Sequence, residues 1–288
     1  MEKRFIKQFG LRPLKKDSRD FKLSAVLKLP PLEELPDEFE LEPLEIKNQL
    51  ETDYCTQMAA CGASELQEGI ELSPEWAFAV SKMISGDPEE FGQDLRTAIK
   101  VHTKFGVIEK GQAPYSLEAG DEDSKMRYIN NWPKELFDKA LGHKKQSYFK
   151  LDGQYDYFDD IRAFLWMNRA KKQVPVIGVE WNWPLDMKVM ETSFAPGGGH
   201  ALYARGWKQI NGEPHLIIQN SYGPEAGDNG KHYFSREIIN QFVEKYGAFV
   251  FVDKNPEKIK KIVWPLWRQI WEWFKKAMTN YFNEFLKT

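Results

Sequence analysis

The chain has 288 residues, a formal net charge of −3 and an aromatic content of 14%. A chain of this length can bury a sizeable core, either in one large domain or in two closely packed lobes. Its 40 basic and 43 acidic residues are interspersed. This pattern lacks the basic surface of a nucleic-acid-binding protein, so we expect no nucleic-acid partner. The aromatic content is typical of a packed globular protein and excludes a disordered one.

The sequence shows no targeting or membrane-spanning segment. MEKRFIKQFG at the start lacks the apolar run of a signal peptide, and no stretch approaches the roughly 18 apolar residues of a membrane span. The two cysteines, Cys55 and Cys61, fall on one predicted helix and point to different sides of it, so we expect no disulfide. These features predict a cytoplasmic protein, and association with a virion is compatible with them.

Residues 1–35 carry charge and proline without a sustained period. We expect an extended lead-in with a short helical turn around Leu23–Leu27. Helical signals then follow in the first half of the chain. A helix begins at Cys55, with Thr52 or Asp53 as its cap, and ends near Gly69. The further predicted helices are Ser73–Ser85, Glu89–Phe105, Pro133–Ala140 and Asp156–Lys171.

The second half of the chain has the composition of short strands. The predicted strands are Val174–Trp181, Ala201–Trp207, His215–Gln219, Lys231–Phe234 and Ala248–Val252, with a helix over Ser235–Tyr246. Asn211-Gly212 indicates a hairpin between two of these strands. The sequence therefore predicts an α+β protein, with a helical lobe at about 50–172 and a mostly antiparallel β lobe at about 173–252. The interface of two such lobes is a natural place for a site.

Cys55 is the candidate nucleophile. A thiol attacks a carbonyl as the thiolate, and the unpaired N–H groups and dipole of a helix N-terminus favour that negative charge. Gln49 lies shortly upstream, where its side-chain amide and the Cys55 N–H could form the two donors of an oxyanion hole. The competing interpretation is a buried, inert cysteine.

His200 is the candidate base among five histidines. It follows Pro196-Gly197-Gly198-Gly199, whose glycines allow close backbone approach, and it starts a predicted strand. Asn220, at the end of another strand, could accept a hydrogen bond from one imidazole nitrogen and leave the other facing a thiol. The remaining histidines are interpreted as surface or half-buried polar residues: His102, His143, His215 and His232.

The order Cys55, His200, Asn220, with Gln49 upstream, resembles the papain-like (C1) cysteine peptidases. It is most similar to the short bacterial and viral members that lack a long propeptide. The segment NSYGPEAGDNG at 220–230 resembles the family pattern N-S-W-G-x-x-x-G-[DE]-N-G, and Glu65 matches an acidic position on the nucleophile helix. The resemblance covers roughly residues 36–252.

This resemblance implies a two-lobe fold and a cysteine endopeptidase that acts on peptide or protein substrates. His200 would take the Cys55 proton and give a resting thiolate–imidazolium pair, with Asn220 orienting the ring and Gln49 binding the oxyanion. No metal or organic cofactor is implied. The implied substrate-binding residues are Gly92, Gln93, Gly198, Gly199 and Tyr222.

Several positions depart from the family pattern. The nucleophile lies in Thr52-Asp53-Tyr54-Cys55-Thr56, where relatives usually have C-G-S-C-W, and no glycine separates Gln49 from Cys55. Gln93 replaces the second of two paired glycines, and Tyr222 replaces a tryptophan that covers the His–Asn bond.

Two alternative functions therefore stay open. One is a weak or inactive papain-like fold used for binding or assembly, and the other is a different thiol acyl transfer, such as ligation or deamidation. The lead-in, 1–35, would either inhibit the site or brace the lobes.

The tail, residues 253–288, carries a separate signal. Aromatic residues recur at spacings of 3 and 4: Trp264, Trp267, Trp271, Phe274, Met278, Tyr281 and Phe285, where methionine takes one position. They predict an amphipathic helix that also carries several basic residues. Three roles are open for residues 258–286: packing on the protein's own body, self-association or partner docking, and contact with a membrane surface.

Overall fold

The computed structural model describes residues 9–18, 20–85, 91–112, 134–192 and 196–252. They belong to one compact unit, Met1–Val252. The C-terminal helix predicted for residues 253–288 lies outside the described residues. No helix in the described ranges combines the length and apolarity that crossing a membrane requires.

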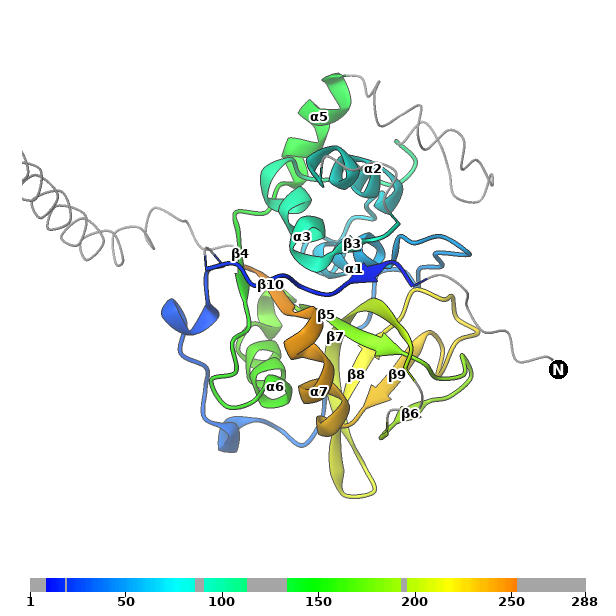
Figure 1. Cartoon of the computed structure of the whole chain (residues 1–288). Coiled ribbons are helices and arrows are strands. Elements are labelled where there is room, and N and C mark those ends of the chain that lie inside the picture. The colour runs from blue at the N-terminus through cyan, green and yellow to red at the C-terminus, as the bar shows by residue number, and fades with distance from the viewer. Residues whose placement is uncertain (1–8, 19, 86–90, 113–133, 193–195, 253–288) are drawn as a thin grey trace, which may run out of the picture. The chain divides into compact units, whose positions relative to one another are not determined.

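Helix α1, Cys55–Glu68, lies on the side of the helical layer that faces the sheet (Figure 1). Its residues are buried from Cys55 to Leu66 because it contacts helices on one side and strand β7 on the other. Gly69 ends the helix in the left-handed conformation at φ 70°, which glycine adopts without a Cβ clash. The neighbouring helices are α2, Pro74–Ser85; α3, Leu95–Lys104; and α5, Lys134–Ala140, which is followed by a 3-10 turn at Leu141–His143.

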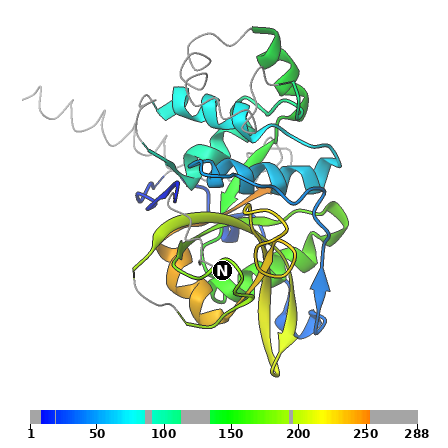
Figure 2. The same ribbon diagram turned by 90° about the vertical axis from the view of Figure 1, so that its right-hand side faces the viewer.

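The β layer is a mainly antiparallel sheet with the order β4-β10-β5-β7-β8-β9-β6 in the described residues. Its strands are β4, Ser147–Lys150; β5, Pro175–Trp181; β6, Val189–Met190; β7, Gly198–Ile210; β8, Glu213–Gln219; β9, Lys231–Phe234; and β10, Ala248–Val252. The predicted hairpin turn is present between β7 and β8, where Asn211 and Gly212 have φ 54° and 84°. Helices α6, Tyr157–Met167, and α7, Arg236–Tyr246, pack against this sheet (Figure 2).

The N-terminal part of the chain runs in an extended path between the helices and the sheet (Figure 1). Strand β1, Leu11–Arg12, pairs in parallel with β3, Gln93–Asp94. Farther along, 3-10 turns occur at Leu23–Ala25 and Leu32–Glu34, and β2, Phe39–Glu40, pairs with β7.

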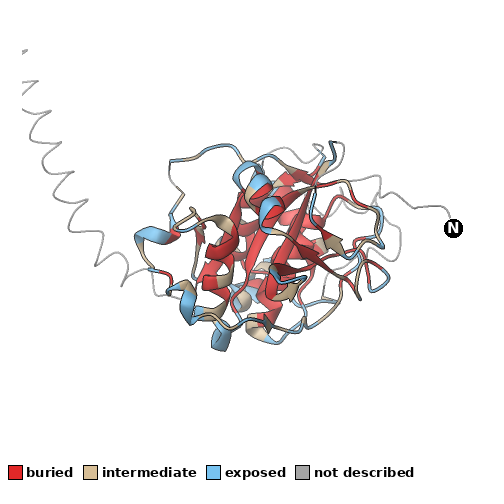
Figure 3. Ribbon diagram, turned by 90° about the horizontal axis from the view of Figure 1, so that it is seen from below, coloured by how far each residue is buried: buried red, intermediate tan, exposed pale blue. Residues whose placement is uncertain are grey.

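The core fills the space between the sheet and the helices that cover it (Figure 3). Large aromatic side chains dominate it, among them Trp76 within the helical layer and Trp181 and Trp207 on the sheet. Such rings bury much apolar area and are major contributors to stability. The α+β class predicted from the sequence is confirmed.

Some predicted boundaries were wrong. The third helix begins at Leu95 rather than Glu89, because Asp94 caps it by accepting a hydrogen bond of 3.1 Å from the Thr97 N–H. Neither Thr52 nor Asp53 caps α1, since the N-cap residue is Tyr54 and it makes no side-chain cap. The Asp53 carboxylate accepts instead from the Gly92 N–H at 2.6 Å.

Two more features differ from the sequence prediction, the end of one helix and an additional strand. Helix α6 ends at Met167, and a 3-10 turn at Arg169–Lys171 follows it. Strand β4, which has no counterpart in the sequence prediction, pairs with β10, so strand pairing crosses the predicted lobe boundary at 172/173.

Candidate active site

Cys55 is the first residue of α1 and is fully buried. Its main-chain N–H is one of the helix N-terminal donors that have no partner within the helix. The main chains of Ala201 and Gly10 lie close enough to the sulfur to lower the pKa of the thiol. Ala201 directly follows His200 on β7, so the helix terminus and the strand bring Cys55 next to the candidate base.

His200 and Asn220 are joined by a hydrogen bond of 2.9 Å between Nε2 and Oδ1. They meet because β7 and β8 are antiparallel neighbours, with Tyr203 opposite Gln219. The Asn220 Oδ1 also accepts from the Ser221 N–H at 2.7 Å, which fixes the oxygen on the side of the imidazole. Nε2 of a neutral His200 therefore carries the proton, and Nδ1 is the nitrogen that can accept one.

Tyr222 covers His200. The two rings are stacked, with centroids 4.5 Å apart and planes within 10° of parallel. The hydroxyl lies 3.1 Å from His200 Nδ1. With the proton on Nε2, Nδ1 accepts a hydrogen bond from this hydroxyl, so Tyr222 must release Nδ1 before that nitrogen takes the Cys55 proton.

Burial favours the neutral forms of both reacting groups. It raises the pKa of the Cys55 thiol to about 12, although main-chain hydrogen bonds from Ala201 and Gly10 act in the opposite direction. It lowers the pKa of His200 to about 3, against the hydrogen bond to Asn220. The thiolate–imidazolium pair expected from the resemblance is therefore not the form that this structure favours.

Gln49 is buried beside the same residues and is tied to two partners. Its Nε2 donates to the Thr52 carbonyl at 2.8 Å, and its Oε1 accepts from the Ser221 hydroxyl at 2.7 Å. Nε2 carries two protons, so one remains for another acceptor. The glycine-free loop between Gln49 and Cys55 is accommodated by Leu50, which has φ 53°.

Four of the five residues expected to bind substrate, all except Tyr222, are contacted by the chain's own N-terminal segment, residues 9–12. The Gln93 N–H donates to the Gly10 carbonyl at 2.8 Å. On the opposite side, a Cβ added to Gly199 would lie 2.1 Å from the Leu11 carbonyl oxygen, and one added to Gly198 would lie 2.2 Å from the Phe9 ring. A Cβ added to Gly92 would lie 2.3 Å from the Gly10 carbonyl oxygen. The segment is therefore extended between the two sets of residues.

His232 is a residue of this site that sequence reasoning missed. Its Nε2 lies 3.0 Å from Asn220 Nδ2, and its Nδ1 lies 2.7 Å from the Met187 carbonyl oxygen. The hairpin between β8 and β9 pairs His232 with Ile218, two residues before Asn220. Pairing the two strands across the glycine-rich turn would have been the signal that places the second histidine near Asn220.

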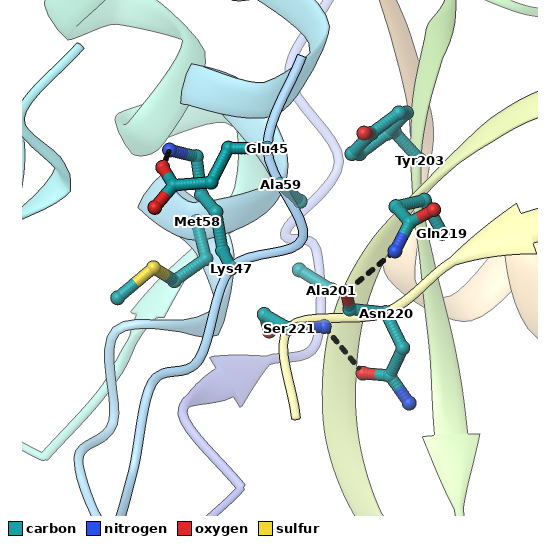
Figure 4. A pocket seen from close by; sticks show the side chains of 9 residues that line it. All are labelled: Glu45, Lys47, Met58, Ala59, Ala201, Tyr203, Gln219, Asn220 and Ser221. Carbon is teal, nitrogen blue, oxygen red and sulfur yellow. Dashed lines mark hydrogen bonds and ion pairs between the residues drawn. The ribbon is translucent and has the colours of Figure 1, made fainter. Parts of the chain in front are cut away.

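A cavity of about 10 Å³ lies between α1 and the ends of β7 and β8 (Figure 4). Met58 and Ala59 line it from the helix, and Ala201 and Asn220 line it from the β layer. This volume holds about one water molecule and no substrate side chain. Among the described residues, no group of three or more His, Cys, Asp or Glu side chains could hold a metal ion.

No protein-family model and no curated protein sequence matches the chain. Solved structures do match it. Xylellain, a cysteine protease from Xylella fastidiosa, superposes with a TM-score of 0.69 at 19% identity, over 88% of this chain and 99% of that one. The fold is that of the papain-like cysteine proteases.

Two further structures share the papain-like fold. Bromelain from Ananas comosus has a TM-score of 0.53 at 16% identity, over 75% of this chain and 98% of its own. Procathepsin L 3 from the larval midgut of Tenebrio molitor has a TM-score of 0.57 at 15% identity, over 80% and 73% of the two chains. The predicted papain-like fold is confirmed. At these identities the likeness concerns the fold alone, so the chemistry depends on the residues described above.

Proposed function

We propose that the chain is a cysteine endopeptidase in which Cys55 is the nucleophile and His200 the base. The observation that supports this most strongly is the convergence of three groups. Cys55 lies at the N-terminus of α1, its sulfur is near the main chain of Ala201, the residue after His200, and His200 is hydrogen-bonded to Asn220 at 2.9 Å. A thiol, an imidazole and an orienting amide in this relation suit acyl transfer.

In the proposed reaction, the Cys55 proton moves to His200 Nδ1, and the thiolate attacks the carbonyl carbon of a peptide bond. The Cys55 N–H and the second Nε2 proton of Gln49 stabilise the negative oxygen. His200 then gives its proton to the leaving nitrogen, the C–N bond breaks, and a thioester remains on Cys55. Water hydrolyses the thioester, releasing the carboxylate and restoring the thiol.

The N-terminal segment makes this site latent. It lies where an extended peptide would bind, and both Cys55 and His200 are fully buried beneath the folded chain. Phe9 packs edge-on to His200, with ring centroids 6.5 Å apart. Arg96 anchors the chain that follows by donating to Asp20 through Nε at 2.6 Å and to the Lys15 carbonyl at 2.9 Å. Substrate therefore binds only after the segment leaves.

Leu11 indicates the chemistry of a substrate subsite. Its side chain is only 4% exposed and packs against Gly178 and Tyr246. A Cβ added to Gly178 would lie 2.6 Å from Leu11 Cδ2 and 2.4 Å from Tyr246 Cβ. The Leu11 side chain therefore fits at this point because residue 178 is a glycine. A site of this kind favours a branched apolar residue in the substrate, because burying it removes apolar area from water.

Cleavage of an unbiased peptide mixture tests the proposal. The chain with its segment displaced should generate new peptide termini, and the Cys55→Ala and His200→Ala variants should generate none. Products whose mass shows ligation or deamidation would point to a different thiol acyl transfer. Absence of any product from a folded variant with an open site would indicate a binding protein with a papain-like fold.

A further inference from the structure

We propose that His232 is a positioning residue of the catalytic group, whose Nε2 lone pair holds the Asn220 amide in the orientation that His200 requires. This inference rests on the proposed function. It concerns a residue that does not touch the reacting atoms and acts through Asn220. A series of hydrogen bonds runs from the Met187 carbonyl through His232 and Asn220 to the Ser221 N–H. The group at each end of this series can act in only one way, as an acceptor or as a donor.

One end of the chain is the Met187 carbonyl oxygen, which can only accept. It lies 2.7 Å from His232 Nδ1, so that nitrogen carries a proton. Burial lowers the pKa of His232 to about 4, so the ring is neutral near pH 7. Its Nε2 is then an acceptor, and the group 3.0 Å away on Asn220 must be the Nδ2 donor.

The other end is the Ser221 N–H, which can only donate. It lies 2.7 Å from Asn220 Oδ1 and assigns that atom as the oxygen, in agreement with the assignment from His232. The same oxygen accepts from His200 Nε2 at 2.9 Å. His200 is therefore held in the tautomer whose Nδ1 is unprotonated, and this is the nitrogen that must take the Cys55 proton.

The side chain of His232 is closely packed on several sides. The residue is fully buried, and a Cβ on Gly227 would lie 2.6 Å from its Nδ1. The Trp181 ring meets both histidines edge-on, with centroids 4.9 Å from His232 and 5.5 Å from His200. A ring fixed in this way is a rigid support for Asn220.

The charged groups on the surrounding segments pair with one another. Lys188 bonds Asp228 at 3.0 Å, and Lys231 bonds Glu40 at 2.6 Å. The titratable group that faces His232 through Asn220 is His200. His232 is thus linked to the base by hydrogen bonds while the neighbouring ions neutralise each other.

Protonation of His232 at Nε2 would reverse the direction of the hydrogen bonds that pass through Asn220. A protonated His232 places an N–H against the Asn220 Nδ2 donor. Turning the amide over relieves this repulsion, at the cost of the Ser221 N–H bond to Oδ1. His200 Nε2 would then face an NH2 group and would have to act as an acceptor, which moves the imidazole proton to Nδ1. In that tautomer the base cannot take the Cys55 proton.

Two replacements separate this role from packing. His232→Gln keeps an acceptor for Asn220 and a donor for the Met187 carbonyl, but it does not titrate. His232→Leu keeps buried apolar volume and offers neither group. In the full chain, both variants are compared with the wild type by thermal unfolding and by the ¹⁵N shifts of the His200 ring. On the Gly10→Ala background, which is designed to displace the N-terminal segment, the same replacements are compared by kcat and KM for a peptide substrate over pH 4–8.

We expect His232→Leu to fold and to lose about 10²-fold in kcat with a nearly unchanged KM, because an Asn220 amide held by the Ser221 N–H alone keeps a smaller share of His200 in the Nε2–H tautomer. His232→Gln should stay within about tenfold of the wild-type kcat, retain the Nε2–H tautomer and lose the acid ionisation of His232. A folded His232→Leu variant with the wild-type tautomer and pH profile would overturn the inference. The ring shifts decide the question even if the wild type cleaves no peptide, so failure of the proposed function is recognised separately.

Discussion

The Gln93 N–H donates a hydrogen bond of 2.8 Å to the Gly10 carbonyl oxygen and so joins the strand before α3 to the N-terminal segment. The main chain of Gly10 also lies near the sulfur of Cys55 and lowers the pKa of this thiol. One residue of the N-terminal segment therefore contacts both the strand expected to hold substrate and the nucleophile. Access to Cys55 depends on whether this residue stays in place.

Gly10→Ala should displace the segment. The added Cβ would lie 1.9 Å from the Asp53 carbonyl oxygen, which is main chain and cannot move aside at low cost. We expect the rate of Cys55 alkylation by iodoacetamide at pH 7.5 to rise at least about tenfold, because exposure favours the thiolate. Gly142→Ala is the matched control, since its Cβ meets nothing within 4 Å. Equal alkylation rates in the two variants would show that the segment does not guard the site.

The segment should also bind in trans. A synthetic peptide of residues 9–18, FGLRPLKKDS, should slow alkylation of Cys55 in the Gly10→Ala variant. A Leu11→Asp change in the peptide should weaken its effect at least about tenfold, because the subsite would have to bury a carboxylate. The peptide with Lys16→Ala is the control, since Lys16 is exposed in the protein. A Leu11→Asp peptide as effective as the original would argue against an apolar subsite.

Gln49→Ala should impair the chemical step. We expect kcat to fall by about 10²–10³-fold with little change in KM, as for loss of one oxyanion donor. Ser221→Ala removes the partner of Gln49 Oε1 and leaves the Nε2 donor, so it should cost much less. Steady-state kinetics on the Gly10→Ala background measures both. An unchanged kcat in Gln49→Ala would remove Gln49 from the reaction.

Stability should fall as the pH falls below about 6.5. Burial lowers the pKa of His102 and His200 to about 3 and that of His232 to about 4, from the ordinary 6.5. Above pH 6.5 these rings are neutral in both folded and unfolded chains. Between pH 6.5 and 4 the unfolded chain takes up protons that the folded chain does not, which costs about 1.4 kcal/mol per pH unit for each ring.

Urea unfolding at pH 7, 6 and 5 measures this slope. His102 is the ring to replace, because it lies in the core between Ser64 and Gln57, at 3.0 and 3.2 Å, and has no part in the proposed reaction. His102→Gln should reduce this slope by the contribution of one ring, about 1.4 kcal/mol per pH unit. A free energy of unfolding that stays flat from pH 7 to 5 would contradict the prediction.

Local patterns predicted much of this fold. Ser73-Pro74-Glu75 identified the start of α2, and Asn211-Gly212 identified the hairpin of β7 and β8, because cap and turn residues act through their immediate neighbours. The papain-like motifs indicated the two-lobe fold. The predicted start of α3 was wrong because the acidic, proline-containing stretch before Asp94 resembles the first turn of a helix.

Contacts between distant segments could not be predicted from the sequence. The pairing of β1 with β3 and the placement of Gly10 at Cys55 depend on packing that no local pattern encodes. The hydrogen bond between Asn220 and His232 requires the register of β8 and β9 to be known. Burial of the reacting pair, which favours its neutral form, likewise arises from the tertiary structure.

The most direct test of the central claim is labelling by a peptidyl epoxysuccinate at pH 6–7, read by intact mass. The reagent requires both a nucleophilic thiol and a site that binds an extended peptide. We predict one adduct on the Gly10→Ala variant, one on the same variant with Cys61→Ala, and none with Cys55→Ala. A folded Gly10→Ala variant whose Cys55 reacts with iodoacetamide but takes no epoxysuccinate would contradict a peptidase site at Cys55.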